Sequence, residues 1–335
     1  MRSVTLAAGL DTSALAFGCA ELLQGPSRAA RRRLLEAALD AGIRHFDAAP
    51  MYALGRAESE LGAFARSRRD QVVVATKFGI DPTAPARLLG HVYGPPQRLL
   101  ERSPRLRERV RPAEGDARAG AVGSILYRAS GYDAEAARRS LERSLRRLRT
   151  DHVDLLLLHD PHPGDVHSDD VRAYLEGARD EGLIGAWGVA GEADATLAAA
   201  RALGGEVPVL QVRDDILSRS RRHLGQELSG TMIAFGTLAR PLRRILAHVR
   251  SDETVTRRWR ERIGIDCTRA DELASLLLRD AAAEKPAGVV LFSTTRTERI
   301  AAAAAAVGPE PRPDPQLDAL RELVSAELES SAAAG

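Results

Sequence analysis

Short apolar runs of strand length alternate with longer amphipathic segments along almost the whole chain. The amphipathic segments repeat apolar residues every three or four positions, the spacing of one helix face, as at Ala137, Leu141 and Leu145. Runs such as Val153–Leu158 are almost entirely apolar, which is typical of strands buried on both faces. The pattern predicts eight strands, at 14–18, 44–47, 71–77, 153–158, 184–189, 207–212, 231–235 and 288–292.

Strands that alternate with helices form parallel sheets, and eight such units in 335 residues favour a closed (β/α)8 barrel, the TIM barrel, as a single domain over 1–335. An open doubly wound sheet is the alternative, but the first strand is not followed by a glycine-rich dinucleotide-binding turn. Long connections at 81–131 and 236–266 follow predicted strands, so we expect them to overhang the mouth of the barrel. A last amphipathic helix is predicted over 315–330.

The composition argues against several classes of protein. The net charge is +2 and charges of both signs are interspersed, so nothing favours nucleic acid as a partner. The apolar runs are too short to span a membrane, and the N-terminus is a poor signal peptide. Two cysteines, Cys19 and Cys267, are too few for a disulfide framework. We therefore expect a cytoplasmic protein; its oligomeric state is not indicated.

The chain uses arginine almost everywhere that a cation is needed. Of its 48 basic residues only Lys77 and Lys285 are lysines. Lysine is a compact ammonium whose pKa moves readily on burial, whereas arginine stays charged. A lysine at the end of a buried strand, as at Lys77, therefore suggests chemistry that arginine cannot supply.

Four polar side chains lie at or just after predicted strand ends: Asp47, Tyr52, Lys77 and His159. In a barrel they converge on one mouth. An ammonium beside a phenol is expected to lower the phenol pKa from about 10, and a carboxylate would hold the ammonium in place. The phenol then acts as a general acid, and the imidazole orients the substrate oxygen. Each residue alone could be structural, but together they suggest carbonyl reduction.

The motifs DAAPMYALGRAESELG, VATKFG, SLERSLRRLRTDHVDLLLLHDP and IGAWGVAG, in this order, resemble those of the aldo-keto reductases. The residues of these motifs are similar to those of the branch that includes the aldose 1-dehydrogenases. The resemblance implies that Asp47, Tyr52, Lys77 and His159 form a catalytic tetrad. It also implies NADP(H), with NAD(H) as an alternative, a carbonyl or sugar substrate, and no metal.

Among the residues expected to bind the cofactor, some positions match the family and others do not. Gln211 matches the glutamine that contacts the nicotinamide carboxamide, and Phe235 matches the aromatic residue on which the nicotinamide stacks. The stretch for the adenosine 2′-phosphate holds Ser293, Thr294, Thr295, Arg296 and Arg299. Within it, Thr295–Glu298 reads as a capping box that opens a helix, a good setting for phosphate.

The sequence departs from the family at three places. Ala190–Gly191 replaces serine-asparagine, Gly236–Leu238 replaces SPL, and alanine replaces an asparagine near Ala303. These losses keep open a catalytically weak accessory or sensor barrel that binds NADP(H).

Two other enzyme classes remain as alternatives. A metal-dependent barrel hydrolase could use the segment His159–His167, which is rich in potential ligands, but it would leave Tyr52 and Lys77 without a role. A Schiff-base aldolase with Lys77 as nucleophile fits the neighbouring tyrosine and aspartate less well.

Overall fold

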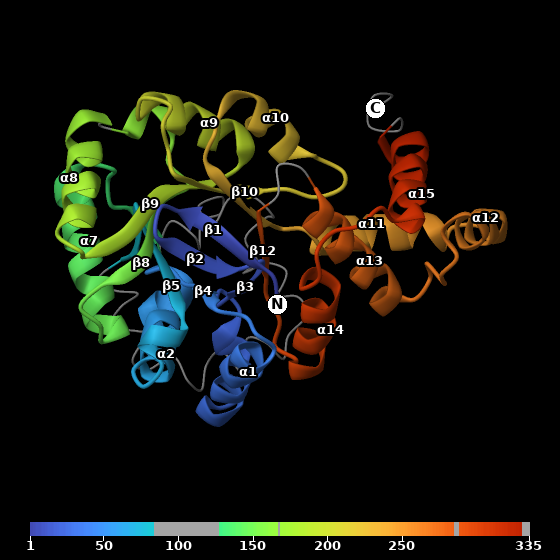
Figure 1. The fold of residues 1–335 in the computed structure, drawn as a ribbon, viewed down its shortest axis with the longest axis horizontal. Helices are drawn as coiled ribbons and strands as arrows, with labels where there is room; N and C mark the ends of the chain where they lie inside the picture. The colour runs from blue at the N-terminus through green and yellow to red at the C-terminus, as the bar shows by residue number, and fades with distance from the viewer. Residues whose placement is uncertain (84–126, 167, 285–287, 330–335) are drawn as a thin grey trace.

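Eight parallel strands close into a barrel, and helices cover its outside (Figure 1). The structure, a computed structural model, describes residues 1–83, 127–166, 168–284 and 288–329. Each barrel strand pairs with the next one in the sequence, and the last pairs with the first. This is the (β/α)8 TIM barrel that the alternating pattern predicts. Its strands are β3 (Leu15–Gly18), β4 (His45–Asp47), β5 (Val73–Phe78), β8 (Val153–His159), β9 (Ile184–Gly191), β10 (Val209–Arg213), β11 (Thr231–Phe235) and β12 (Val289–Phe292).

The covering helices lie close to the amphipathic segments of the sequence. The segment 218–230 has the least regular apolar spacing of these segments, and it too contains a short helix. The helices that follow the barrel strands are α1 (Arg28–Asp40), α2 (Arg56–Ala65), α7 (Ala134–Leu148), α8 (Ser168–Asp180), α9 (Ala193–Ala202), α10 (Ser220–Glu227), α13 (Ala270–Ala283) and α14 (Thr297–Val307).

Successive side chains of each strand point to opposite faces, so the barrel has an inner core in its lumen and an outer core beneath the helices. On β8, Leu155 and Leu157 face the lumen, while Leu156 and Leu158 face the helices. Both sets are fully buried, and each leucine contributes roughly 1.5–3 kcal/mol relative to an exposed one. The residues that continue the inner set to the carboxyl end of each strand therefore point into the mouth.

The hairpin β1 (Ser3–Ala7) and β2 (Leu10–Ser13) closes the other end of the barrel. Its side chains Leu6 and Leu10 belong to the same buried cluster as Val73 and Val209, which lie at strand starts. Among the described residues, the open end of the barrel is therefore the one at the carboxyl ends of the strands.

The segment 236–266, expected to be a long loop, contains helices α11 (Ala239–Val249) and α12 (Glu253–Ile263). With α13 and α15 (Pro315–Val324) they enclose a second hydrophobic cluster around Trp259, and Figure 1 shows these helices together on one side of the barrel. A π-helical turn, Ser325–Glu329, continues α15, so the two elements lie where the sequence predicts its last helix.

The other long connection, 81–131, begins and ends in a small antiparallel pair. Its strands are β6 (Ile80–Pro82) and β7 (Tyr127–Ala129). The expected loop between them, 84–126, lies outside the described residues, as does Lys285.

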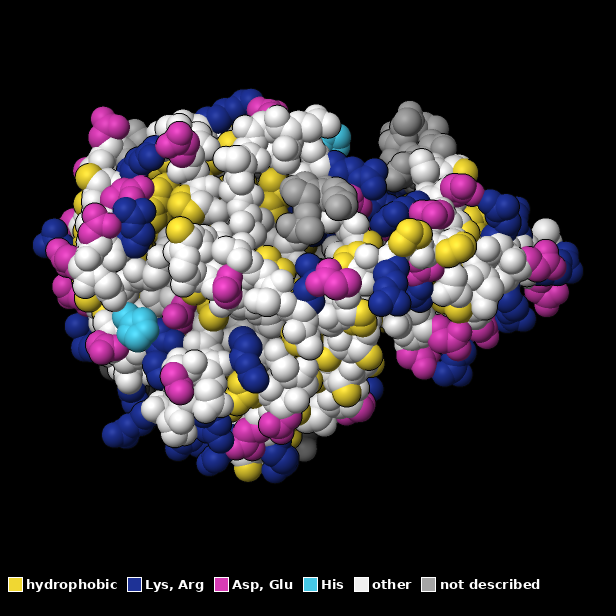
Figure 2. Space-filling view, in the orientation of Figure 1, with side chains coloured by type: hydrophobic (Ala, Val, Ile, Leu, Met, Phe, Trp, Pro, Cys, Tyr) yellow, Lys and Arg dark blue, Asp and Glu magenta, His cyan; other side chains and the backbone are white. Residues whose placement is uncertain are grey.

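Acidic and basic side chains are interspersed over the face that Figure 2 displays, which agrees with the charge pattern of the sequence. Across the described ranges, every helix is too short or too polar to cross a membrane.

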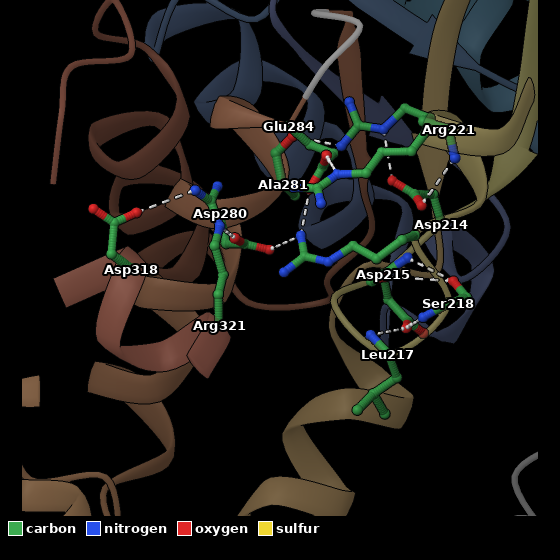
Figure 3. A network of polar contacts seen from close by, with 12 residues as sticks. Asp214, Asp215, Leu217, Ser218, Arg221, Asp280, Ala281, Glu284, Asp318 and Arg321 are labelled. Atoms are coloured by element: carbon green, nitrogen blue, oxygen red, sulfur yellow. Dashed lines mark hydrogen bonds and ion pairs between the residues drawn. The ribbon is translucent and has the colours of Figure 1, made fainter. Parts of the chain in front are cut away.

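A buried network of charges fixes the loop that follows β10 (Figure 3). Arg221, 1% exposed, donates from Nε to Asp214 Oδ2 at 2.6 Å and from Nη2 to Ala281 O at 2.6 Å. Arg219 contacts Asp280 and Glu284 of the α13 segment. The loop after β10 is thereby tied to α13, and this holds the carboxyl end of β10 in place.

Candidate active site

A cavity of about 360 Å³ lies at the carboxyl ends of the barrel strands. It is lined by all four predicted catalytic side chains, Asp47, Tyr52, Lys77 and His159, and also by Gln211, Phe235 and Ser293 from the predicted cofactor set. The strand-end positions converge because Asp47, Lys77 and His159 continue the lumen-facing set of β4, β5 and β8.

Asp47 and Lys77 form an ion pair at the base of the cavity. Lys77 Nζ lies 2.5 Å from each carboxylate oxygen of Asp47 and donates to Ala48 O at 3.2 Å. The side chains are 1% and 2% exposed. Removing two charges from water is costly, and a pair of apolar residues would often be at least as stable. A functional reason for keeping the pair is therefore expected.

Tyr52 enters the cavity from the loop after β4, at the start of a short turn, Tyr52–Gly55. The two residues after it, Ala53 and Leu54, have φ of 48° and 61°, followed by Gly55 at 85°. Left-handed backbone costs roughly 1–2 kcal/mol for each non-glycine residue. Such strain concentrates at functional sites, and here it fixes the position of the phenol.

The Tyr52 hydroxyl stays protonated over a wider pH range than in water. Burial raises its pKa well above the usual value, and the charges of Asp47 and Asp160 raise it further. The expectation that Lys77 lowers this pKa is wrong for the site as it stands. The ammonium lies 5.3 Å from the centre of the Tyr52 ring, but both oxygens of Asp47 contact it and offset its field.

His159 stands edge-on to Tyr52, with ring centroids 5.9 Å apart and an interplanar angle of 90°. The Tyr132 hydroxyl, fully buried, lies 2.6 Å from the His159 carbonyl oxygen and fixes the backbone there. A protonated phenol and an imidazole thus flank one point of the cavity. Such a pair can donate hydrogen bonds to a single substrate oxygen.

Gln211 carries a buried acceptor that the described residues leave unpaired. Its Nε2 donates to Asp47 Oδ2 at 3.2 Å, whereas Oε1 has no hydrogen-bond partner there. A buried acceptor without a partner costs about 1–3 kcal/mol, so a ligand with an N–H group would be favoured at this atom. Phe235 is half-buried beside it in the lining, with the Arg213 guanidinium 5.0 Å from its ring centre.

The predicted phosphate-binding residues follow β12. Ser293 lines the cavity, and Thr294 is buried with its hydroxyl accepting from Arg296 N at 3.2 Å. Thr295, Arg296 and Arg299 are exposed and lie outside the cavity lining.

The expected capping box is wrong. The N-cap of α14 is Arg296, one residue later than predicted, and its side chain makes no capping hydrogen bond. The first backbone N–H groups of α14 are therefore available to an anion.

Asp160, which follows His159 and lines the cavity, was not among the residues predicted for the site. Nor was a role predicted for Gly191, where a Cβ would lie 3.0 Å from Asp160 Oδ1. The only sequence signal for Asp160 is its position directly after a strand-end histidine.

The two alternative enzyme classes find little support. Among the residues that the structure describes, no three His, Cys, Asp or Glu side chains are placed to hold a metal ion. His167, one of the suggested ligands, lies outside them. An aldolase would use the Lys77 amine as nucleophile, whereas both carboxylate oxygens of Asp47 contact Lys77 Nζ at 2.5 Å.

Comparison with known proteins identifies the family of the chain. The sequence model of the aldo/keto reductase family matches residues 14–226. D-threo-aldose 1-dehydrogenase of a Pseudomonas species is 36% identical over 189 residues, 55% of this chain and 51% of that protein. Pyridoxal 4-dehydrogenase of Microbacterium luteolum is 35% identical over 156 residues, 45% of this chain and 41% of that protein. The chain thus spans about half the length of the curated relatives it matches, or less.

Solved structures share the fold over nearly the whole chain. The holo form of an aldo-keto reductase from Bacillus halodurans has a TM-score of 0.69 at 21% identity, covering 98% of this chain and 99% of that one. A glycerol dehydrogenase from Gluconobacter oxydans has a TM-score of 0.68 at 17% identity, covering 98% and 96%.

Proposed function

Because this chain belongs to the aldo/keto reductase family, we propose that it is an NADP(H)-dependent oxidoreductase. It transfers a hydride between the nicotinamide and the carbonyl or hydroxyl carbon of an aldehyde, ketone or sugar, with Tyr52 as general acid and base. The observation that carries the proposal is the convergence of Asp47, Tyr52, Lys77 and His159 on one cavity.

In the reducing direction the carbonyl oxygen lies between the Tyr52 hydroxyl and the His159 ring. Tyr52 donates its proton as negative charge develops on that oxygen, and its raised pKa keeps the proton in place beforehand. The phenolate that results faces the Lys77 ammonium, 5.3 Å from the ring centre. Asp47 positions Lys77. In the oxidising direction the phenolate takes the proton of the alcohol.

The residues present fit a nicotinamide dinucleotide. Gln211 Oε1 is a buried acceptor that needs a donor, and the nicotinamide carboxamide has one. Phe235, which lines the same cavity as Gln211, is a platform for the flat nicotinamide ring. The uncapped start of α14, with Arg296 and Arg299 nearby, suits the adenosine 2′-phosphate. The bound nicotinamide supplies the hydride.

The substrate is a small neutral carbonyl compound or sugar. Two relatives are by name dehydrogenases of an aldose and of pyridoxal, which supports this class. Cys19 and Cys267 are both buried and unbonded, in keeping with a reducing compartment, and we assign the protein to the cytoplasm.

The test is a titration of NADPH with the purified protein, followed by NADPH fluorescence, and then a screen of aldehydes, ketones and free sugars. We expect the fluorescence to change and at least one carbonyl class to be reduced. Binding without turnover of any substrate would favour the accessory or sensor barrel. Absence of binding would refute the proposal.

A further inference from the structure

Arg213 and Phe235 lie side by side at the carboxyl ends of β10 and β11. The two residues are partners in the register of these parallel strands, so their side chains leave the sheet on the same face. Arg213 Cζ lies over the Phe235 ring, 5.0 Å from its centre. In this geometry the cation attracts the π electrons of the ring. The charge of Arg213 therefore acts on one face of Phe235.

Two neighbours hold the guanidinium in this position. Arg213 Nε donates to Glu192 Oε1 at 2.6 Å, and Glu192 follows β9 as the N-cap of α9. Gly236, directly after Phe235, has φ of 76°, and a Cβ there would lie 2.8 Å from Arg213 Nη1. Glycine adopts this backbone conformation without strain, and its lack of a side chain leaves room for the arginine. Arg213 thus connects the ends of three successive strands.

The guanidinium lies behind Phe235 as seen from the cavity. Phe235 and Gly236 line the cavity, whereas Arg213 and Glu192, with side chains 27% and 46% exposed, are not among the lining residues. An arginine between the ring and the cavity would itself line the cavity. The positive charge is therefore on the side of the ring that faces away from the cavity, and the other side is open to a ligand.

From this arrangement we propose that Arg213 weakens binding of the oxidised dinucleotide relative to the reduced one. The inference rests on the proposed function, in which the nicotinamide stacks on Phe235. The oxidised nicotinamide ring carries a positive charge, whereas the reduced ring is neutral. A fixed positive charge behind Phe235 repels only the oxidised ring, and it draws π electrons away from the face that the ligand contacts. Glu192 offsets part of this charge, because its carboxylate contacts Arg213 Nε.

A shift of affinity toward NADPH favours reduction of a carbonyl compound and release of the oxidised nucleotide. Arg213 acts through Phe235, so it is a residue that sets cofactor preference and not a catalytic residue. The same charge explains why an arginine with an acidic partner stands beside the aromatic platform.

The test is a pair of titrations, one with NADPH and one with NADP⁺, followed by quenching of tryptophan fluorescence at low ionic strength, where charges are least screened. The ratio of the Kd for NADP⁺ to the Kd for NADPH is compared between the wild type and four variants. Arg213→Met removes the charge, Arg213→Lys keeps a charge, and Glu192→Gln removes only the acidic partner. Arg179→Met is the matched control, because Arg179 is an ion-paired arginine in the last turn of α8, on the outside of the barrel.

We expect Arg213→Met to lower the ratio about 3- to 10-fold, mainly through tighter binding of NADP⁺. Glu192→Gln should raise the ratio, because the charge of Arg213 is then uncompensated. Arg213→Lys and Arg179→Met should stay within about twofold of the wild type. Both Arg213→Met and Glu192→Gln break the same ion pair, so a purely structural effect would not shift the ratio in opposite directions.

The outcomes separate the two proposals. A wild type that binds neither nucleotide would overturn the proposed function, and this inference with it. If the wild type binds both, a ratio that is unchanged in Arg213→Met and Glu192→Gln, or that moves the same way in both, would overturn the role of Arg213 and leave the proposed function intact. If Arg213→Met fails to fold, Glu192→Gln decides alone, because it changes a partly exposed side chain.

Discussion

Replacing Lys77 by methionine removes the charge that faces Asp47, in a pair whose side chains are almost completely buried. Asp47 is 1% exposed, and apart from Lys77 its carboxylate accepts a hydrogen bond from Gln211 Nε2 at 3.2 Å. Removing one partner of a buried ion pair costs about 3–5 kcal/mol, since the other charge is left uncompensated. We expect this loss for Lys77→Met and a similar loss for Asp47→Asn.

The double variant distinguishes a coupled pair from two separate packing defects. Asp47→Asn with Lys77→Met leaves no buried charge, so its loss should be smaller than the sum of the single losses by about 2 kcal/mol or more. The free energy of unfolding of each variant is measured by urea denaturation. Tryptophan fluorescence reports the unfolding, because Trp187 and Trp259 are both fully buried. Additive losses would refute the reasoning that the two charges stabilise one another.

Three further predictions follow from single contacts. Burial lowers the pKa of His45 to about 4. The wild type should therefore lose up to about 3 kcal/mol of stability as pH falls from 6.5 to 4, and His45→Leu should not. If urea unfolding showed the same dependence of stability on pH for both proteins, this prediction would be contradicted. Gly62→Ala places a Cβ 2.3 Å from Leu148 O and should cost about 1–3 kcal/mol by separating α2 from α7; an unchanged melting temperature would be inconsistent with that close approach. Arg299→Ala should weaken NADPH binding about tenfold but leave NADH binding unchanged, and equal effects on both would remove Arg299 from the 2′-phosphate site.

The barrel could be predicted because its strands have a clear sequence signal. Runs such as Val153–Leu158 are apolar on both faces, and the residue that ends each run has a fixed direction once the fold is known. The scarcity of lysine singled out Lys77 in the same way. The convergence of Asp47, Lys77 and His159 therefore follows from local pattern and fold class together.

The helices within 236–266 were missed although their periodicity is present. Leu242, Ile245 and Val249 repeat at helical spacing, and Asp252 caps the next helix, accepting from Thr254 N at 2.6 Å. The long interval between strand and helix obscured this pattern.

Other features had no local signal. The left-handed backbone of Asp160 is held by hydrogen bonds with Tyr132 and Ala190, which are distant in sequence. The Tyr52 pKa depends on burial and on the nearby charges of Asp47 and Asp160, which three-dimensional packing brings together. Both are properties of the assembled mouth, so the sequence indicated the groups involved but not how they act on one another.

The most direct test of the account is Tyr52→Phe, which removes one hydroxyl and keeps the ring beside Lys77 and His159. NADPH titration and carbonyl reduction should be measured on the same preparation. The account predicts NADPH affinity within about threefold of the wild type and a fall in kcat of about 100-fold or more, because proton donation is lost. Turnover equal to the wild type would contradict the claim that Tyr52 supplies the proton.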